Sequence, residues 1–152
     1  STAIKEVLAA ADSAGRWWHG YTYSGHPIGA AVALATIAAI KDEGLVERAA
    51  TLGERLLAGL AAELGDHPHV GDIRGRGLLA AVEPVADRET KAPFADELNV
   101  AGRIRTRLAD LGLVTRVPDN AICLAPPLII TEAEVDRIVE VVTTAVKDVT
   151  ES

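Results

Sequence analysis

The sequence predicts a small α+β domain in which short pairs of strands carry helices on one side. Three observations lead to this class. Apolar residues recur at spacings of three or four in three separate segments, as in amphipathic helices. Four short apolar segments, joined in pairs by Gly- or Pro-containing turns, are typical of strands. A long and almost wholly apolar segment precedes them. Strands and helices in this order favour one sheet with helices packed on one face.

The first 26 residues contain one short helix and a cluster of aromatic residues. Apolar spacing predicts a helix from Ile4 to Ala11, which the polar residues 12–15 end. Four of the five aromatic residues of the chain then fall within seven positions, namely Trp17, Trp18, Tyr21 and Tyr23. These aromatic side chains could hold a flat ligand or separate it from water.

Pro27 suits the first position of a helix, where its missing N–H costs nothing. Every residue from Ile28 to Ile40 except Gly29 and Thr36 is apolar. A bilayer needs about 20 residues of helix, so this segment is too short to cross one. We expect a helix that is buried on nearly all sides, and the chain offers it little surface to pack against.

The remaining residues alternate helices with strand pairs. An amphipathic helix is expected from Leu45 to Leu64, and a second around Leu98–Leu111. A last helix opens with Thr131 and Glu134 in the spacing of a capping box. The expected strands are Val70–Ile73 with Leu78–Val82, and Leu113–Val117 with Ala121–Leu124.

Composition limits the function. The 152 residues have a net charge of −7, which argues against a nucleic-acid groove or an anionic membrane surface. The one cysteine, Cys123, excludes an internal disulfide and suits a reducing compartment, and no signal-peptide pattern is visible. We therefore expect a cytoplasmic protein. The chain starts at Ser1 and lacks methionine, which indicates a processed, trimmed or partial chain.

Thr22 and Ser24 are the first candidate binding residues. They lie just before the helix that starts at Pro27, where free backbone N–H groups and the helix dipole favour an anion such as phosphate. The alternative is structural: Ser24 caps the helix and the tryptophans belong to the core. The residues alone leave both interpretations open.

Other polar residues are weaker candidates. Arg74 and Arg76 flank glycines in an expected turn and could contact a phosphate, although a role in the strand turn is the simpler interpretation. His67 and His69 have no third ligand at metal-binding spacing. Cys123 is expected to be an inert core thiol, and His26 to serve the geometry of the helix start.

Several motifs together resemble one enzyme family. The string HGYTYSGHP at residues 19–27 is followed in register by RGRGL at 74–78, LVTR at 113–116 and CLAPPL at 123–128. This pattern is similar to the C-terminal part of class III (ω-type) aminotransferases, which depend on pyridoxal 5'-phosphate. The resemblance covers nearly the whole chain, from about Ser13 to the last helix.

The resemblance implies a fold-type I enzyme that is a homodimer or higher homo-oligomer with active sites at the subunit interface. It implies that Thr22 and Tyr21 contact the cofactor phosphate of the neighbouring subunit, and that Arg116 binds the substrate carboxylate. The planar, doubly donating guanidinium of arginine suits that role, whereas the alternative is a surface arginine beside Asp119. It also divides the chain into the end of a large domain with an interface loop (1–26), a connecting helix (27–43) and a small domain (44–152).

The family's reaction moves an amino group between an amine or ω-amino acid and a keto acid such as pyruvate. It requires a lysine that forms a Schiff base with the cofactor. None of the lysines present stands in the family's lysine motif, and they are Lys5, Lys41, Lys91 and Lys147. We therefore expect the missing large domain to supply it and this chain alone to be inactive. The competing hypotheses are a stand-alone interaction or assembly module and a generic α+β ligand-binding domain.

Overall fold

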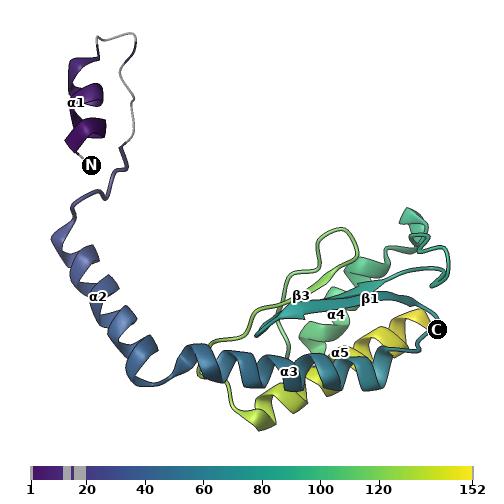
Figure 1. Ribbon diagram of the computed structural model, residues 1–152. Helices are drawn as coiled ribbons and strands as arrows, with labels where there is room; N and C mark the ends of the chain where they lie inside the picture. Colours follow the sequence, from purple (N-terminus) through teal and green to yellow (C-terminus); the bar gives the residue numbers. More distant parts are fainter. Residues whose placement is uncertain (1, 12–14, 16–19, 152) are drawn as a thin grey trace. The chain divides into compact units, whose positions relative to one another are not determined.

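The computed structural model describes residues 2–11, 15 and 20–151 (Figure 1). The chain forms two compact units, residues 1–39 and residues 40–152. Each unit is described by itself below. The three-part division into 1–26, 27–43 and 44–152 stays a prediction.

The first unit contains α1 (Thr2–Ala10) and most of α2 (Pro27–Asp42), close to the bounds expected for both helices. The expectation that α2 is buried on nearly all sides is wrong for this structure, because α2 buries none of its residues. Ile40 is partly exposed, and the other large apolar side chains of α2 are 50–69% exposed, namely Ile28, Val32, Leu34 and Ile37. A helix such as α2 can form its hydrogen bonds within one segment of the chain. Burial of its side chains requires a second surface that packs against them. Within the described ranges, none of the helices combines the length and apolar character needed to span a membrane.

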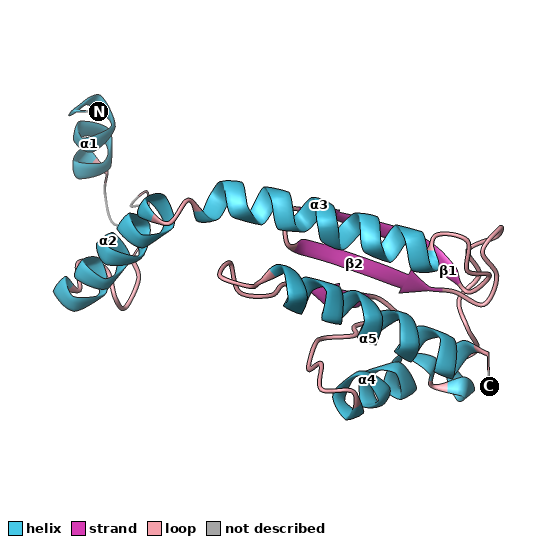
Figure 2. Ribbon diagram, turned by 90° about the horizontal axis from the view of Figure 1, so that it is seen from below, coloured by secondary structure: helices cyan, strands magenta, loops and turns pink. Residues whose placement is uncertain are grey.

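The second unit is a three-stranded antiparallel sheet with helices on one face (Figure 2). In chain order it contains α3 (Leu45–Leu64), β1 (Val70–Arg76), β2 (Leu79–Pro84), the 3-10 helix η1 (Asp96–Leu98), α4 (Val100–Asp110), β3 (Ile122–Leu124) and α5 (Glu132–Thr150). The strand order is β1-β2-β3. Helix α5 packs against both α3 and α4. The predicted α+β class is confirmed.

Of the two expected strand pairs, the first forms and the second does not. The first forms as the β1–β2 hairpin, in which Arg74, Gly75 and Arg76 belong to β1 rather than to a turn. The second does not form as a pair, since β3 adds to β2 and segment 113–117 contributes a single bridge between Arg116 and Cys123. Pro118 has no N–H to extend a ladder, and the positive φ angles of Asp119 (52°) and Asn120 (131°) turn the chain away.

The core lies between the sheet and helices α3, α4 and α5. Leu56, Leu60 and Leu64 of α3 are fully buried, as are apolar residues of the other two helices. Helix α3 approaches the β1–β2 turn very closely at Gly53, where an added Cβ would lie 2.2 Å from the carbonyl carbon of Gly77. Only glycine at position 53 allows that approach.

Polar contacts fix how α5 sits on this core. The predicted capping box is confirmed, because the Thr131 hydroxyl accepts from the Glu134 N–H and the Glu134 carboxylate accepts from the Thr131 N–H. Arg55 of α3 donates to both carboxylate oxygens of Asp136 on α5, each at 2.7 Å. The hydrogen bond and charge of Arg55 lower the pKa of Asp136. An ion pair between charged side chains therefore links α3 to α5 on the solvent-exposed side of their contact.

Candidate functional site

The aromatic loop forms a tight turn that presents Thr22. The Ser24 N–H donates to the Tyr21 carbonyl at 2.9 Å, and the Ser24 hydroxyl accepts from the Tyr21 N–H at 3.3 Å. Thr22 is the second residue of this turn and is exposed, and Tyr21 is 69% exposed. The two predicted cofactor-binding residues are therefore adjacent on one exposed turn. Trp17 and Trp18, for which a place in the core was the alternative, lie outside the described residues.

His26, and not Ser24, caps the start of α2. Its Nδ1 atom accepts from the Gly29 N–H at 3.1 Å, and its ring contacts Tyr23 edge-on at 5.7 Å between centroids. The expected role of His26 in the helix start is confirmed, and the capping alternative for Ser24 is wrong. Pro27 has no N–H, and the His26 N–H donates to the Tyr23 carbonyl. The next backbone donors of α2 bond back to His26 as well, because the Gly29 N–H donates to its Nδ1 atom and the Ala30 N–H to its carbonyl.

The free backbone donors expected at this helix start are thus mostly used within the turn. The side-chain hydroxyls become the principal donors, because Ser24 uses its oxygen as an acceptor and retains its O–H, and Thr22 makes no side-chain hydrogen bond among the described residues. Hydroxyl groups of this kind can donate to phosphate oxygens. The turn fits the phosphate end of a cofactor.

A second group of candidates lies on the face of the sheet opposite the helices. Arg74, Ala81, Cys123 and Arg116 are successive cross-strand partners, and directly opposite residues share a face. The alternate residues of β2 and β3, such as Val82 and Ile122, are fully buried on the other face. The sheet therefore places the predicted substrate-binding residue, Arg116, in one row with Arg74.

The two arginines of this row differ in their partners. Arg74 donates to Asp72 at 2.8 Å and to Glu83 at 2.6 Å, and these hydrogen bonds raise the pKa of Arg74. Its charge is balanced within the sheet, which removes the support for phosphate binding. The Arg116 side chain is exposed, and among the described residues it makes no hydrogen bond or ion pair, with Asp119 or any other group. Arg116 is available to an external anion.

The remaining candidates have structural contacts. Cys123 is half-buried on the open face, so its placement in the core was wrong, and its thiol donates to the Ala121 carbonyl at 3.7 Å. His67 is buried and bonds Glu151 at 3.1 Å, while the His69 N–H donates to His67 Nδ1. These contacts connect the α3–β1 loop to the end of α5.

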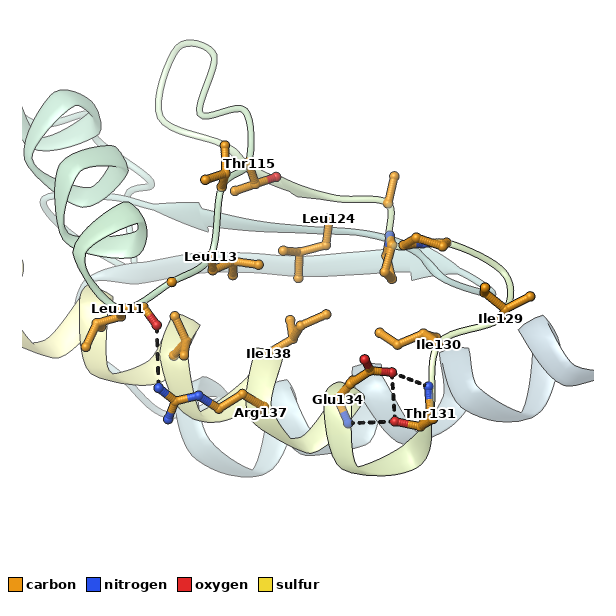
Figure 3. Close-up of a pocket in the computed structure, with 16 residues that line it drawn as sticks. Leu111, Leu113, Thr115, Leu124, Ile129, Ile130, Thr131, Glu134, Arg137 and Ile138 are labelled. Atoms are coloured by element: carbon orange, nitrogen blue, oxygen red, sulfur yellow. Dashed lines mark hydrogen bonds between the residues drawn. The ribbon is translucent and has the colours of Figure 1, made fainter.

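Sequence reasoning missed a pocket of about 730 Å³ at the β3 edge of the second unit (Figure 3). Its walls are mainly apolar and come from segments 111–115 and 124–131 and from the first half of α5. Arg137 donates to the Leu111 carbonyl at 3.5 Å, and Glu134 is held in the capping box, which lowers its pKa. The apolar residues 128–130 directly after Pro126 and Pro127 are the sequence signal that could have indicated it.

The four lysines of the chain lie on four separate segments. Lys5 lies on α1 and Lys41 near the end of α2. Lys91 is in a loop with φ of 55°, and Lys147 of α5 lies 3.7 Å from Glu63. None stands beside the Thr22 turn in sequence. The described candidates for anion binding are the Thr22 turn in the first unit and Arg116 in the second.

Comparison with known proteins decides the family. Residues 1–146 match the family model described as Aminotransferase class-III. The chain belongs to the class III aminotransferases. It is 43% identical over 141 residues to an uncharacterized aminotransferase of Sinorhizobium fredii, and 34% identical over 134 residues to the putrescine–pyruvate aminotransferase of Pseudomonas aeruginosa. These matches cover 91% and 88% of this chain but only 30% and 29% of the relatives.

Solved structures agree with this aminotransferase assignment. The ω-transaminase of Pseudomonas jessenii in complex with PMP superposes with a TM-score of 0.86 at 40% identity, over 99% of this chain and 33% of that one. An (S)-enantioselective ω-transaminase from Thermomicrobium roseum gives the same TM-score and identity over 98% and 33%. The chain thus spans about a third of the length of the enzymes it matches.

Proposed function

We propose that this chain is the part of a class III aminotransferase that binds the cofactor phosphate through Thr22 and Tyr21 and the substrate carboxylate through Arg116. The reaction proposed for the whole enzyme moves an amino group between an amine or ω-amino acid and a keto acid such as pyruvate. The observation that carries the proposal is the exposed Arg116 guanidinium, which has no partner among the described residues and lies on the open sheet face. Two of the relatives are named for pyruvate, the putrescine and taurine aminotransferases.

Each of these residues has one task in this proposal. The Thr22 hydroxyl donates to a phosphate oxygen, and the turn closed by Ser24 orients it. The Arg116 guanidinium binds both oxygens of a carboxylate and moves aside for a substrate without one. Pyridoxal 5'-phosphate, when bound, supplies the electron sink that amino-group transfer needs. The chain's own residues orient the two anionic groups.

The rest of the enzyme is proposed from the family resemblance. A large domain supplies the lysine, and a second copy of the enzyme completes each active site in a cytoplasmic homodimer or higher homo-oligomer. The second candidate function is a stand-alone interaction or assembly module. The observation that favours it is α2, which buries none of its apolar side chains.

The proposed division of labour predicts that the 152-residue polypeptide does not catalyse transamination by itself. We expect no turnover with pyruvate and an amine donor, because no lysine of the chain fits the covalent role. Borohydride reduction in the presence of pyridoxal 5'-phosphate, followed by mass spectrometry, provides the check. Stoichiometric labelling of one defined lysine, together with turnover, would show that the chain is a complete catalyst.

The Arg116 role is tested by Arg116→Ala in a full-length class III holoenzyme that carries this segment. We expect kcat/KM for pyruvate and for amino acid donors to fall by roughly 30- to 150-fold, from about 2–3 kcal/mol for a lost bidentate contact. The half-reaction of an aromatic amine, which has no carboxylate, should stay within about twofold.

The measurement must follow single half-reactions, because steady-state turnover with pyruvate mixes both substrates. Arg74→Ala is a matched control, since Arg74 is in the same row but already paired with Asp72 and Glu83. If Arg116→Ala slows the amine and the carboxylate substrates equally, Arg116 has a structural role instead.

A further inference from the structure

We propose that Thr115 is a positioning residue for Arg116, holding the backbone that carries the guanidinium while leaving the side chain free to move. This inference rests on the proposed carboxylate role of Arg116. It assigns the selectivity for carboxylate substrates to two residues. Arg116 binds the carboxylate, and Thr115 holds the backbone of Arg116 in place.

The contact that carries the inference is a side-chain hydrogen bond that reinforces a single antiparallel bridge. The Cys123 N–H donates to the Arg116 carbonyl at 2.9 Å, as in an antiparallel bridge. The Cys123 carbonyl, on the other side of this bridge, accepts a hydrogen bond from the Thr115 hydroxyl. Thr115 and Arg116 are therefore both tied to one residue of β3.

Neighbouring backbone bonds hold both ends of this short segment. Before it, the Leu113 N–H donates to the Leu108 carbonyl at the end of α4 at 2.8 Å. After it, the N–H groups of Asn120 and Ala121 both donate to the Pro118 carbonyl at 2.8 Å. Segment 113–121 is thus bonded to α4 at its start and to β3 in its middle, and it closes its turn with bonds of its own.

The Arg116 side chain contrasts with this fixed backbone. Thr115 is half-buried, whereas Arg116 is exposed and has no side-chain partner among the described residues. A bidentate guanidinium–carboxylate contact depends strongly on direction, so a fixed backbone reduces the ordering cost of binding. A free side chain still allows the guanidinium to leave when the substrate has no carboxylate. The Thr115 hydroxyl fixes the backbone of Arg116 and leaves the Arg116 side chain free to move.

Thr115→Val in the full-length holoenzyme removes the hydroxyl and keeps the shape. We expect kcat/KM for pyruvate to fall by roughly 3- to 10-fold, mainly through a higher KM. This fold-change corresponds to the net contribution of one neutral hydrogen bond. The half-reaction of an amine without a carboxylate should stay within about twofold. In an Arg116→Ala background, Thr115→Val should have no further effect on pyruvate, because a residue that acts through Arg116 is not additive with it.

Thr115→Ser and Thr115→Ala form a second pair that differs only in the hydroxyl, and it is used if the valine variant does not fold. The serine variant should keep the pyruvate preference and the alanine variant should lose it. Equal slowing of both substrates by Thr115→Val, or additivity with Arg116→Ala, would overturn the positioning role while leaving that of Arg116 intact. Failure of Arg116→Ala itself to separate the substrates would overturn the proposed function instead.

Discussion

Helices α2 and α3 are both rich in apolar residues, yet they have opposite environments. Leu60 of α3 is fully buried, whereas Leu34 of α2 is 69% exposed. Helix α3 confines its apolar residues to one stripe, and the sheet and α5 cover that stripe. Helix α2 has apolar residues on every side and buries none of them.

The difference shows what apolar patterning can and cannot predict. A stripe identifies both a helix and the side that faces a core, because the polar side is defined too. An all-apolar segment identifies a helix that must be covered on every side. It does not indicate which part of the protein covers it. Exposed apolar surface of this extent marks an interaction surface. For α2 that surface is consistent with a chain that spans about a third of its relatives' length.

The largest effect is expected for Leu60→Ala. Removing a fully buried leucine from the core between α3, the sheet and α5 should lower the free energy of unfolding of the second unit by about 2–5 kcal/mol. Native-state hydrogen exchange of the α3 and α5 amides measures this loss for the second unit alone.

Leu34→Ala is the matched control for Leu60→Ala in the same 152-residue polypeptide. The same exchange measurement should change by less than about 0.5 kcal/mol, because Leu34 makes no buried contact here. Equal losses in the two variants would show that α2 belongs to the packed core, and the contrast between the helices would disappear.

An intermediate effect is expected for Thr131→Ala at the start of α5. Loss of the capping box should cost about 1 kcal/mol of stability in the second unit. The hydrogen bonds of Thr131 lower the pKa of Glu134, so their stabilisation is present above the unfolded carboxyl pKa and is lost as the pH falls. The difference between wild type and variant should therefore narrow below about pH 4. A difference that widens in acid would contradict this assignment.

Much of the fold could be predicted from local sequence. The stripe of α3, the capping box at Thr131 and the first strand pair all depend on residues close together in the chain. The second strand pair could not, since segment 113–117 was expected to follow an ordinary ladder. Instead, a single bridge forms between Arg116 and Cys123, and Pro118, which has no N–H, ends the pairing. The burial of α2 could not be predicted, because it depends on surfaces outside the helix.

The candidate site shows the same limit. The motif strings led to Thr22, Tyr21 and Arg116, and the structure places them on exposed segments of the two units. The common row of Arg74 and Arg116 follows from strand register, which short motifs do not contain. The capping role of His26 removed backbone donors that the helix start was expected to offer.

The most direct test of the binding roles proposed for Thr22 and Arg116 is the dissociation constant of pyridoxal 5'-phosphate, measured for two variants of the full-length enzyme. Thr22→Val should raise it by about 10-fold or more, because a hydrogen bond to a charged group contributes about 1.5–3 kcal/mol. Arg116→Ala should leave it within about twofold, since its partner is the substrate carboxylate. Unchanged cofactor affinity in Thr22→Val, or equal weakening in both variants, would contradict the assignment of phosphate to Thr22 and carboxylate to Arg116.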